Sequence, residues 1–515
     1  MFYKLISTLR DPEYFPHPCR TIDVIETPIS WVVLTGDYAY KFKKPVNFGF
    51  LDFTTLEQRR TYCEEEIRLN QRLAPDIYLD VVPVSGSGES PKIGDDSAPF
   101  EYAVRMAQFD PEQRLDRQLA RQLFEAEWID MLAEQIADFH QRIPIVAQDS
   151  PWGEPETLWE FIADNYRTCA ERVERLEDSA KLHKLLSFTA ADFRAKERNL
   201  RNRKKLGYIR ECHGDLHLGN ITLFKKELRL FDCIEFNLQF RWIDTLSDLA
   251  FLLMDLEANG QPRWANRCLN YYLELTGDYK GVPLINLYKA YRSMVRAKVA
   301  LIGEQPDWDS FYHYLNLTDS YCQTTQPVLY LMHGVSGSGK SYLSGQLVEA
   351  IGGIRIRSDC ERKRIHRDLS RRGESLDLYG AEMNMRTFHH TLDLAKRLLK
   401  AGHTVVVDAT LIRKRTRSNY IELAESLGAP VRIISCHCKL HLIEARLTRR
   451  IEEGKDPSDA DIAVMHQQLT SGQPLSPEEQ MITLPVDTEN DEAIEQLLAQ
   501  LRAQNLLKTH ENTHE

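Results

Sequence analysis

The chain has 515 residues, of which 43% are hydrophobic and 27% are charged, a balance typical of globular proteins. Its length allows two or three domains, and its net charge of -11 argues against a protein covered in nucleic acid. No stretch approaches the roughly 20 apolar residues of a membrane-spanning helix. The first 18 residues contain prolines and charges and lack the apolar core of a signal peptide. We therefore expect a cytoplasmic protein without a membrane partner.

The ten cysteines are scattered along the chain, and only Cys436 and Cys438 lie close together. A single C-x-C without a second pair is a weak indication of a metal site. Buried, reduced thiols on a strand are the simpler interpretation.

The first predicted unit is a hairpin in WVVLTGDYAYKFKK (31–44), which turns at residues 35–37 and places Lys41 on its second strand. Residues 55–75 have helical periodicity, and Glu65 or Glu66 on that helix could pair with Lys41. Such a pair would direct the lysine ammonium towards nucleotide phosphates. A solvent-exposed strand lysine is the alternative. The Gly/Ser/Pro-rich stretch 85–99 is expected to join two strands.

The stretch HGDLHLGN (213–220) separates Asp215 from Asn220 by the spacing of the Asp and Asn in a kinase catalytic loop. A predicted hairpin follows and ends at Asp232. A carboxylate is needed to orient an acceptor hydroxyl and take its proton, and an amide oxygen with a second carboxylate can hold Mg²⁺. The alternative is a glycine-containing turn in which Asp215 and Asn220 cap the backbone.

These motifs, with AYK at Lys41, FDCIEF (231–236) and DTLSDLA (244–250), make the first 320 or so residues resemble the aminoglycoside phosphotransferase family. The resemblance implies a two-lobed α+β kinase-like fold. It also implies that Asp215 is the catalytic base, that Asn220 and Asp232 are magnesium ligands, and that Asp248 braces the catalytic loop. Residues 101–109 would form the adenine-binding hinge, and His140 is expected in the core.

The sequence departs from kinase patterns in two ways. The turn TGDY offers one glycine where a G-x-G-x-x-G loop would cover the phosphates, and Gly214 stands where protein kinases have arginine. Lys289, Arg292 and Arg296 are spaced along one helical face, which favours an anionic partner or a set of surface ion pairs. We do not expect aminoglycosides, which are polycations, to be the acceptor.

The clearest domain boundary is the short polar stretch CQTTQP (322–327). Beyond it, strands and helices alternate as in a parallel α/β domain. The run PVLYLMHGVSGSGKS contains a complete P-loop between a strand and a helix. Its backbone and side chains are expected to hold ATP phosphates, with Lys340 at the β- and γ-phosphates and Ser341 on Mg²⁺. The loop consists of Gly334, Val335, Ser336, Gly337, Ser338, Gly339, Lys340 and Ser341.

Two further predicted strands lead to Asp359 and Asp408, which should emerge beside the P-loop at the carboxyl edge of the sheet. Asp408 is a candidate magnesium ligand and Asp359 a candidate base, although either could simply cap its strand. A fourth strand covers 431–436. The helix after it carries Arg446, Arg449 and Arg450, and we assign the closure on the transferred phosphoryl group to Arg446. A solvated face is the alternative.

The residues GVSGSGKS, SDCERK (358–363), VVDAT (406–410) and the arginine-rich helix make the second half resemble P-loop kinases of the polynucleotide-kinase and zeta-toxin type. The resemblance implies phosphoryl transfer to a hydroxyl, with Arg362 near the acceptor. The surrounding sequence is basic and would suit an acceptor that already carries phosphate, such as a nucleotide sugar or a polynucleotide end. The basic residues are Arg362, Lys363, Arg364, Arg367, Arg371, Arg372, Arg413, Lys414, Arg415 and Arg417. For half of them, solvated surface charge is the alternative.

The sequence thus predicts a bifunctional ATP- and Mg²⁺-dependent kinase. We expect a kinase-like domain over 1–322, a linker at 323–326, an α/β P-loop NTPase domain with a parallel sheet over 327–505, and a disordered tail at 506–515. The acceptors are hydroxyl-bearing molecules that the sequence does not name, and it gives no oligomeric state. In the alternative, one domain binds nucleotide only to regulate the other. The N-terminal domain is the candidate for this role, because its glycine loop is degenerate.

Overall fold

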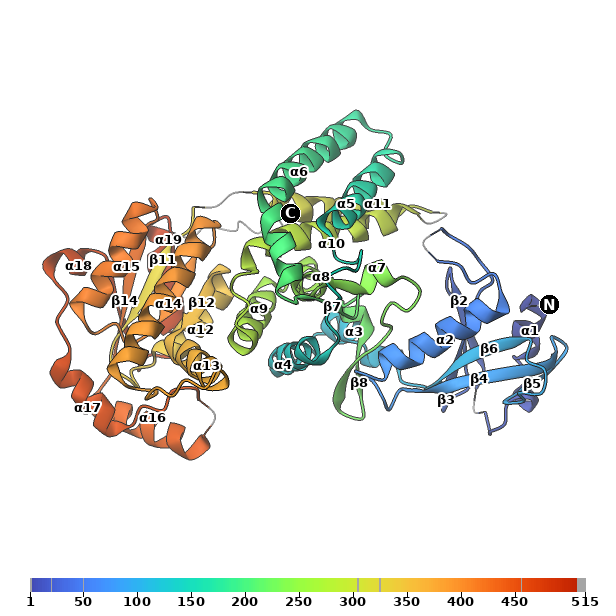
Figure 1. The fold of residues 1–515 in the computed structure, drawn as a ribbon, viewed down its shortest axis with the longest axis horizontal. Helices are drawn as coiled ribbons and strands as arrows, with labels where there is room; N and C mark the ends of the chain where they lie inside the picture. The colour runs from blue at the N-terminus through green and yellow to red at the C-terminus, as the bar shows by residue number, and fades with distance from the viewer. Residues whose placement is uncertain are drawn as a thin grey trace. The chain divides into compact units, whose positions relative to one another are not determined.

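The computed structural model describes residues 2–19, 21–49, 51–302, 305–323, 326–454 and 456–506. Residues 324 and 325 of the predicted linker, and the predicted tail from residue 507, lie outside the described residues. The chain divides into two compact units, each described here by itself: Met1–Asp255 with Leu287–Thr318, and Leu256–Asn286 with Asp319–Glu515 (Figure 1). Within the described residues, no helix is long and apolar enough to cross a membrane.

The first unit begins with a six-stranded antiparallel sheet of order β1-β2-β3-β6-β4-β5. The expected hairpin is formed by β2 and β3, with its turn at residues 35–37. The stretch 85–99, expected to be a plain connection, contains the additional strand β5. The strands are β1 (Asp23–Glu26), β2 (Ser30–Leu34), β3 (Tyr38–Lys43), β4 (Tyr78–Ser87), β5 (Ser90–Ile93) and β6 (Glu101–Ala107).

Helix α2 (Leu56–Asn70) packs against β4 and β6. It begins with a capping box, in which Thr55 Oγ1 accepts a hydrogen bond from the Gln58 N–H, and Gln58 Oε1 accepts one from the Thr55 N–H. Buried Cys63 and Leu69 lie on this helix, whereas Glu66 is also fully buried despite its charge. The fold therefore places a carboxylate inside the interface between α2 and the sheet.

The remainder of the first unit is mainly helical. Its short strands β7 (Ile209–Glu211), β8 (Ile221–Phe224), β9 (Glu227–Leu230) and β10 (Trp242–Asp244) form two antiparallel pairs, β7 with β10 and β8 with β9. Helices α8 and α11 begin in this unit and end in the second. The helices are α1 (Phe2–Thr8), α3 (Leu115–Ala120), α4 (Glu127–Arg142), α5 (Pro155–Ala170), α6 (Leu176–Lys205), α7 (Leu238–Arg241), α8 (Thr245–Ala258), α10 (Ile285–Ile302) and α11 (Trp308–Tyr321).

The second unit is built on a five-stranded parallel sheet of order β12-β13-β11-β14-β15, which confirms the predicted P-loop fold. Its core combines Tyr330, Leu347 and Val406 with the C-terminal helix residues Leu497 and Leu501. The strands are β11 (Leu329–His333), β12 (Ile354–Arg357), β13 (Val405–Asp408), β14 (Val431–His437) and β15 (Thr483–Asp487). Around them lie α12 (Lys340–Ile351), α13 (Ser358–Arg371), α14 (Ala381–Lys400), α15 (Lys414–Ser426), α16 (Leu440–Glu453), α17 (Ile462–Ser471), α18 (Pro477–Met481) and α19 (Ala493–Ala503).

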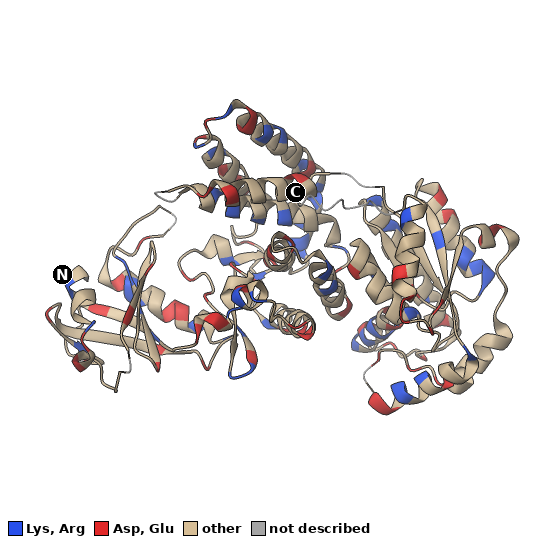
Figure 2. Ribbon diagram, turned by 180° about the vertical axis from the view of Figure 1, so that it is seen from behind, with Lys and Arg blue, Asp and Glu red and all other residues tan. Residues whose placement is uncertain are grey.

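Helix α9 (Pro262–Thr276) also belongs to this second unit, although it precedes the predicted boundary at 322–327 by about 50 residues. It packs against α12 and β12. The compact units therefore differ from the sequence-based division by residues 256–286 and, at the boundary itself, by residues 319–322. Both signs of charge are interspersed over the two units (Figure 2).

Candidate active sites

Lys41 and Lys43 point to the same side of β3, and both contact Glu66. Lys41 Nζ lies 2.8 Å from Glu66 Oε1, and Lys43 Nζ lies 2.7 Å from Glu66 Oε2. Of the two glutamates considered from the sequence, Glu66 therefore contacts Lys41, whereas Glu65 pairs with Arg68 and Arg241. Burial acts to raise the pKa of Glu66, but the two ammonium groups outweigh it and bring the pKa down to about 2.

The catalytic-loop residues Asp215 and Asn220 are joined directly. Asn220 Nδ2 donates to both the Asp215 backbone oxygen and Asp215 Oδ2, each at 3.0 Å. Burial opposes ionisation of Asp215, yet His217, His213 and Arg292 together hold its pKa well below the usual range. Asp215 is therefore an ionised carboxylate in a fixed position.

Asp248 on α8 holds the start of this loop. Its two carboxylate oxygens accept hydrogen bonds from the backbone N–H groups of His213, at 3.1 Å, and Gly214, at 2.8 Å. His140 Nε2 lies 3.2 Å from Asp248 Oδ2, and both side chains are buried. This geometry agrees with a bracing position for Asp248 and a core position for His140.

Asp232 lies two residues after the end of β9, and only Phe231 intervenes. Its backbone is left-handed, with a φ of 63°. Its backbone N–H donates to the Tyr78 hydroxyl at 3.1 Å, and the next N–H, that of Cys233, donates to Asn70 Oδ1 at 2.8 Å. The Asp232 carboxylate is 44% exposed and contacts Lys41 Nζ at 2.7 Å. Left-handed backbone in a non-glycine residue persists only where surrounding contacts fix it, and such residues gather at functional sites.

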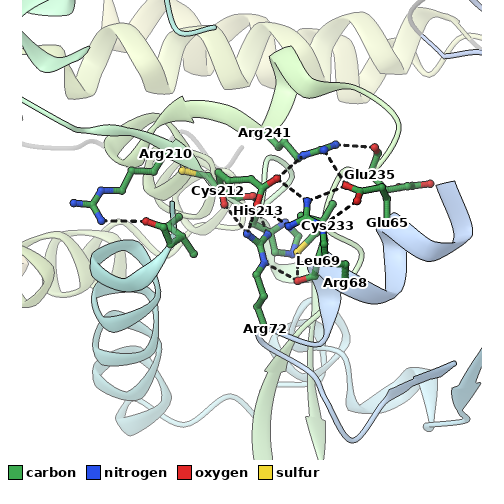
Figure 3. A network of polar contacts seen from close by, with 12 residues as sticks. Glu65, Arg68, Leu69, Arg72, Arg210, Cys212, His213, Cys233, Glu235 and Arg241 are labelled. Atoms are coloured by element: carbon green, nitrogen blue, oxygen red, sulfur yellow. Dashed lines mark hydrogen bonds and ion pairs between the residues drawn. The ribbon is translucent and has the colours of Figure 1, made fainter. Parts of the chain in front are cut away.

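Three arginines connect α2 to the strand that precedes the catalytic loop (Figure 3). Around the buried Glu211 carboxylate lie Arg68 at 2.7 Å, Arg72 at 3.3 Å and Arg241 at 3.3 Å. Arg72 also donates to the Glu211 backbone oxygen at 2.8 Å. Because α2 carries Glu66, this network fixes the Lys41–Glu66 pair relative to Asp215.

The donor set of this first site fits Mg·ATP. The Asp232 carboxylate and the Asn220 amide supply hard oxygen ligands of the kind that Mg²⁺ prefers. The Asn220 amide nitrogen is used by Asp215, and among the described residues the amide oxygen makes no hydrogen bond, so it is available to a cation. Partly buried Phe109 is the last residue of the expected hinge, and its ring centroid lies 5.1 Å from that of Phe231.

The prediction that Arg292 belongs to a basic stripe on the surface of α10 is wrong. This guanidinium is buried and donates to the Ser247 and Gly214 backbone oxygens, each at 3.2 Å, so it supports the catalytic loop from behind. Arg296 is partly buried, with Nε 3.4 Å from the Tyr314 hydroxyl. Within the described part of the chain, neither guanidinium lies in an exposed ion pair of the kind that the spacing suggested.

The phosphate-binding loop of the second site follows β11 and opens α12. Gly334 has a φ of 139°, and a Cβ there would lie 2.7 Å from both the Cys436 backbone oxygen and Ser338 Oγ. The backbone can curl in this way only with glycine at that position. The loop thus forms a cradle of N–H groups at the N-terminus of a 12-residue helix, which suits phosphate. One of its amides, that of Ser336, donates to Gln468 Oε1 of α17 at 2.7 Å.

Lys340, Ser341 and Asp408 lie together at the end of this loop. Ser341 Oγ donates to Asp408 Oδ1 at 3.3 Å, and Ser344 Oγ donates to Asp408 Oδ2 at 3.1 Å. Burial lowers the pKa of Lys340 despite the opposing charge of Asp408. A hydroxyl and a carboxylate are suitable magnesium ligands beside a phosphate loop, so the residues present fit Mg·ATP.

Asp359 and Arg446 both line the same large cleft, of about 2170 Å³. Asp359 lies in the first turn of α13 and, among the described residues, has no hydrogen-bond partner. Arg446 donates to the Thr488 backbone oxygen at 2.7 Å, and Thr488 Oγ1 in turn donates to the Ser338 oxygen at 2.9 Å. Arg450 also lines the cleft, and its charge acts on Lys340.

The expected basic loops are only partly surface features. Residues 362–371 belong to helix α13, and Arg364 pairs with buried Glu361. Arg417 is fully buried, with Nε 2.7 Å and a terminal nitrogen 2.9 Å from the two Glu479 oxygens, so its assignment to a substrate-facing charge cluster is wrong. Arg413 and Arg415, in contrast, are exposed and line the cleft.

Sequence reasoning missed Lys43, Glu235 and Glu274. Lys43 contacts the buried carboxylates of Glu66 and Glu235. Glu274 of α9 contacts Arg355 and Arg357 beside the P-loop. The FDCIEF run did place Glu235 near Asp232, which was a usable signal, but Glu274 lies far from the P-loop in sequence and offered none.

Comparisons with known proteins agree with this two-part organisation. Residues 52–284 match a family described as "Phosphotransferase enzyme family", and residues 329–475 match one described as "AAA domain". Uncharacterized protein Rv2004c from Mycobacterium tuberculosis and uncharacterized protein Mb2027c from Mycobacterium bovis are each 30% identical to the chain over 450 residues. The alignment covers 86% of this chain and 89% of each relative.

Solved structures also align with the chain. A gluconokinase from Sinorhizobium meliloti shows 22% identity and a TM-score of 0.27, and covers 35% of this chain and 96% of its own. The APS kinase CysC of Mycobacterium tuberculosis shows 18% identity and a TM-score of 0.26, and covers 35% and 98%. Similarity at this level identifies no substrate.

Proposed function

The chain belongs to the family of the mycobacterial protein Rv2004c and is a kinase, and we propose that it transfers the γ-phosphoryl group of ATP at two separate sites. The observation that carries this proposal is that each unit holds its own complete set of groups. In one, Lys41 pairs with Glu66, and Asp215 with Asn220. In the other, Lys340 and Ser341 adjoin Asp408.

At the first site, Asp215 would orient the acceptor hydroxyl and take its proton as the oxygen–phosphorus bond forms. Lys41, fixed by Glu66, would hold ATP phosphates, while Asn220 and Asp232 would hold Mg²⁺. The bound cation would neutralise charge on the phosphates. The brace from Asp248 and the arginine network around Glu211 support this role, because they fix the parts that must be in register.

At the second site, the P-loop and Lys340 would hold the phosphates, and Ser341 and Asp408 would hold Mg²⁺. Asp359 would be the base for the acceptor hydroxyl, since its carboxylate faces the cleft without a hydrogen-bond partner among the described residues. We propose that Arg446, which lines the cleft, is the arginine that closes on the transferred phosphoryl group. Arg450, which also lines the cleft, is a second candidate for the arginine that approaches the transferred group.

We further propose an anionic acceptor for the second site. Arg362, Arg413 and Arg415 line the cleft, and within the described part of the chain none of them pairs with a carboxylate. Arginine suits phosphate because it offers several N–H donors in a planar arrangement. A small phosphorylated metabolite is the class we favour, and a polynucleotide end is the other outcome that the experiment below can give.

The proposal is tested by incubating the protein with γ-labelled ATP and either a metabolite extract or RNA. We expect two sets of labelled products, one lost in Asp215→Asn and the other lost in Lys340→Ala. If Asp215→Asn leaves every product unchanged while the first unit still binds ATP, the first unit is a regulatory nucleotide-binding module instead. Label on RNA that Lys340→Ala removes would identify a polynucleotide end as the second acceptor.

A further inference from the structure

Helix α9 carries a carboxylate into the P-loop site of the second unit. Glu274 is largely buried, and its Oε1 accepts a hydrogen bond from Arg355 Nε at 2.8 Å. Its Oε2 lies 3.3 Å from a terminal nitrogen of Arg357. One side chain thus holds two arginines that project from the same edge strand, β12.

Both arginines contact the residues we assign to Mg²⁺. Arg355 donates to the Ser341 backbone oxygen at 3.0 Å and approaches Ser344 Oγ at 3.5 Å. Arg357 Nε lies 3.5 Å from Asp408 Oδ2, and another of its nitrogens lies 3.7 Å from Asp456. Glu274 is therefore connected to Ser341 through Arg355 and to Asp408 through Arg357.

The charges explain why this contact matters. Arg357 is nearly buried beside Asp408, and a cation so close to a magnesium ligand competes with the metal for the same carboxylate. Glu274 supplies a second carboxylate that shares the guanidinium. Without it, we expect Arg357 to move fully onto Asp408.

We infer that Glu274 is a positioning residue for the P-loop kinase, and that it keeps Asp408 available to Mg²⁺ by holding Arg355 and Arg357. The inference rests on the proposed function of the second site and adds a residue from the sequence region that matches the phosphotransferase family. Tyr271, Glu274 and Leu275 of the same segment also line the cleft, so α9 forms part of its wall.

The test measures nucleotide binding in the full chain, with Lys41→Met present throughout to weaken the first site. Fluorescent ATP is titrated without Mg²⁺, and Mg²⁺ is then titrated into the complex. For Glu274→Gln we expect a rise of about tenfold in the Mg²⁺ concentration that produces half of the fluorescence change. This corresponds to the loss of one charge-assisted hydrogen bond. Binding without Mg²⁺ should change less than about twofold, because the P-loop itself is intact.

Two further variants separate positioning from general damage. Glu349→Gln removes the 3.6 Å ion pair between Arg267 of α9 and Glu349 of α12, which does not touch the site, and should leave both titrations unchanged. Arg357→Gln added to Glu274→Gln removes the released cation and should restore the Mg²⁺ response. A purely structural role would not be rescued in this way.

The inference is overturned if Glu274→Gln leaves the Mg²⁺ response unchanged, if it weakens Mg²⁺-free binding equally, or if Arg357→Gln gives no rescue. Lys340→Ala distinguishes this from a failure of the proposed function. If Lys340→Ala retains full nucleotide binding, the P-loop assignment itself is wrong. If it abolishes binding while Glu274→Gln behaves like the parent, only the positioning role is lost.

Discussion

Lys41 and Lys43 lie two residues apart and contact the same glutamate, yet their surroundings give them different tasks. Lys43 is 1% exposed and is held between Glu66 and Glu235. Lys41 is 13% exposed and reaches the half-exposed Asp232. The strand pattern predicted a lysine near the nucleotide, but only the three-dimensional structure separates the one facing the site from the one inside it.

We predict that Lys43→Met destabilises the protein and that Lys41→Met does not. Removing Lys43 leaves two buried carboxylates short of a partner, at a cost of about 3–5 kcal/mol of unfolding free energy. Removing Lys41 leaves Glu66 paired with Lys43 and should mainly weaken ATP binding. Urea unfolding monitored by circular dichroism, combined with ATP titration, checks both. Equal stability of the two variants would contradict the distinction.

Arg415 and Arg417 provide a second contrast. Arg417→Ala leaves Glu479 buried and unpaired, so we expect a loss of about 3–5 kcal/mol in unfolding free energy. Arg415→Ala changes an exposed cleft residue, so stability should stay within about 0.5 kcal/mol. Once the second acceptor is identified, its KM should rise about tenfold in Arg415→Ala, because one phosphate contact is lost. An unchanged KM would remove Arg415 from the acceptor site.

Two sets of predicted site residues that lie close together in the structure are also close together in the sequence. Asp215 and Asn220 are five residues apart, and the P-loop is a continuous run, so spacing alone brings the groups together. Arg292 and Arg417 were misjudged because burial depends on distant partners. Glu479 follows Arg417 by 62 residues, and no pattern around Arg417 indicates that contact.

At the scale of elements, α9 protects the edge of the parallel sheet. Strand β12 is the outermost strand, and its free edge presents the Arg355 N–H and the Gly353 oxygen. Asn270 of α9 satisfies both, accepting from Arg355 N at 2.7 Å and donating to the Gly353 oxygen at 2.9 Å. One amide side chain thus replaces the neighbouring strand that an edge lacks.

We therefore expect Asn270→Ala to lower the unfolding free energy by about 2–3 kcal/mol, since one buried and one partly buried backbone group lose their partner. Asn266→Ala is the matched control on the same helix. Its side chain donates to the Glu349 backbone oxygen at 2.9 Å, and the residue is only partly buried. Denaturant unfolding of the two variants checks the difference. A cost for Asn270→Ala no larger than for Asn266→Ala would mean that the edge contact contributes little.

Periodicity predicted the strands around the P-loop because each is short, apolar and followed by a polar turn or a helix. It missed β15, the other edge strand, where Pro485 interrupts the apolar pattern. Proline is tolerated there because an edge strand needs only one row of hydrogen bonds. The location of α9 could not be predicted, since an amphipathic helix does not reveal which surface it covers.

Over the whole molecule, each compact unit is built from two separate segments of the chain, and these segments alternate in sequence. Residues 256–286 are joined at both ends to the first unit, yet belong to the second. The P-loop segment produced alone, without the N-terminal part of the chain, would therefore lack its edge cover and Glu274.

This organisation predicts the result of cleaving the chain at residues 324–325 with an inserted protease site. The two fragments should remain together in gel filtration, because α9 of the N-terminal fragment completes the second unit. The same cut should leave ATP binding by the P-loop intact. Fragments that separate and fold on their own would show that 256–286 is not an integral part of that unit.

We propose that the chain binds Mg·ATP at two independent sites. Titration calorimetry with a non-hydrolysable ATP analogue and Mg²⁺ measures how many nucleotides each chain binds. We predict two nucleotides per chain, one lost in Lys41→Met, the other lost in Lys340→Ala, and both lost in the double variant. A single bound nucleotide that depends on only one of these lysines would contradict the account.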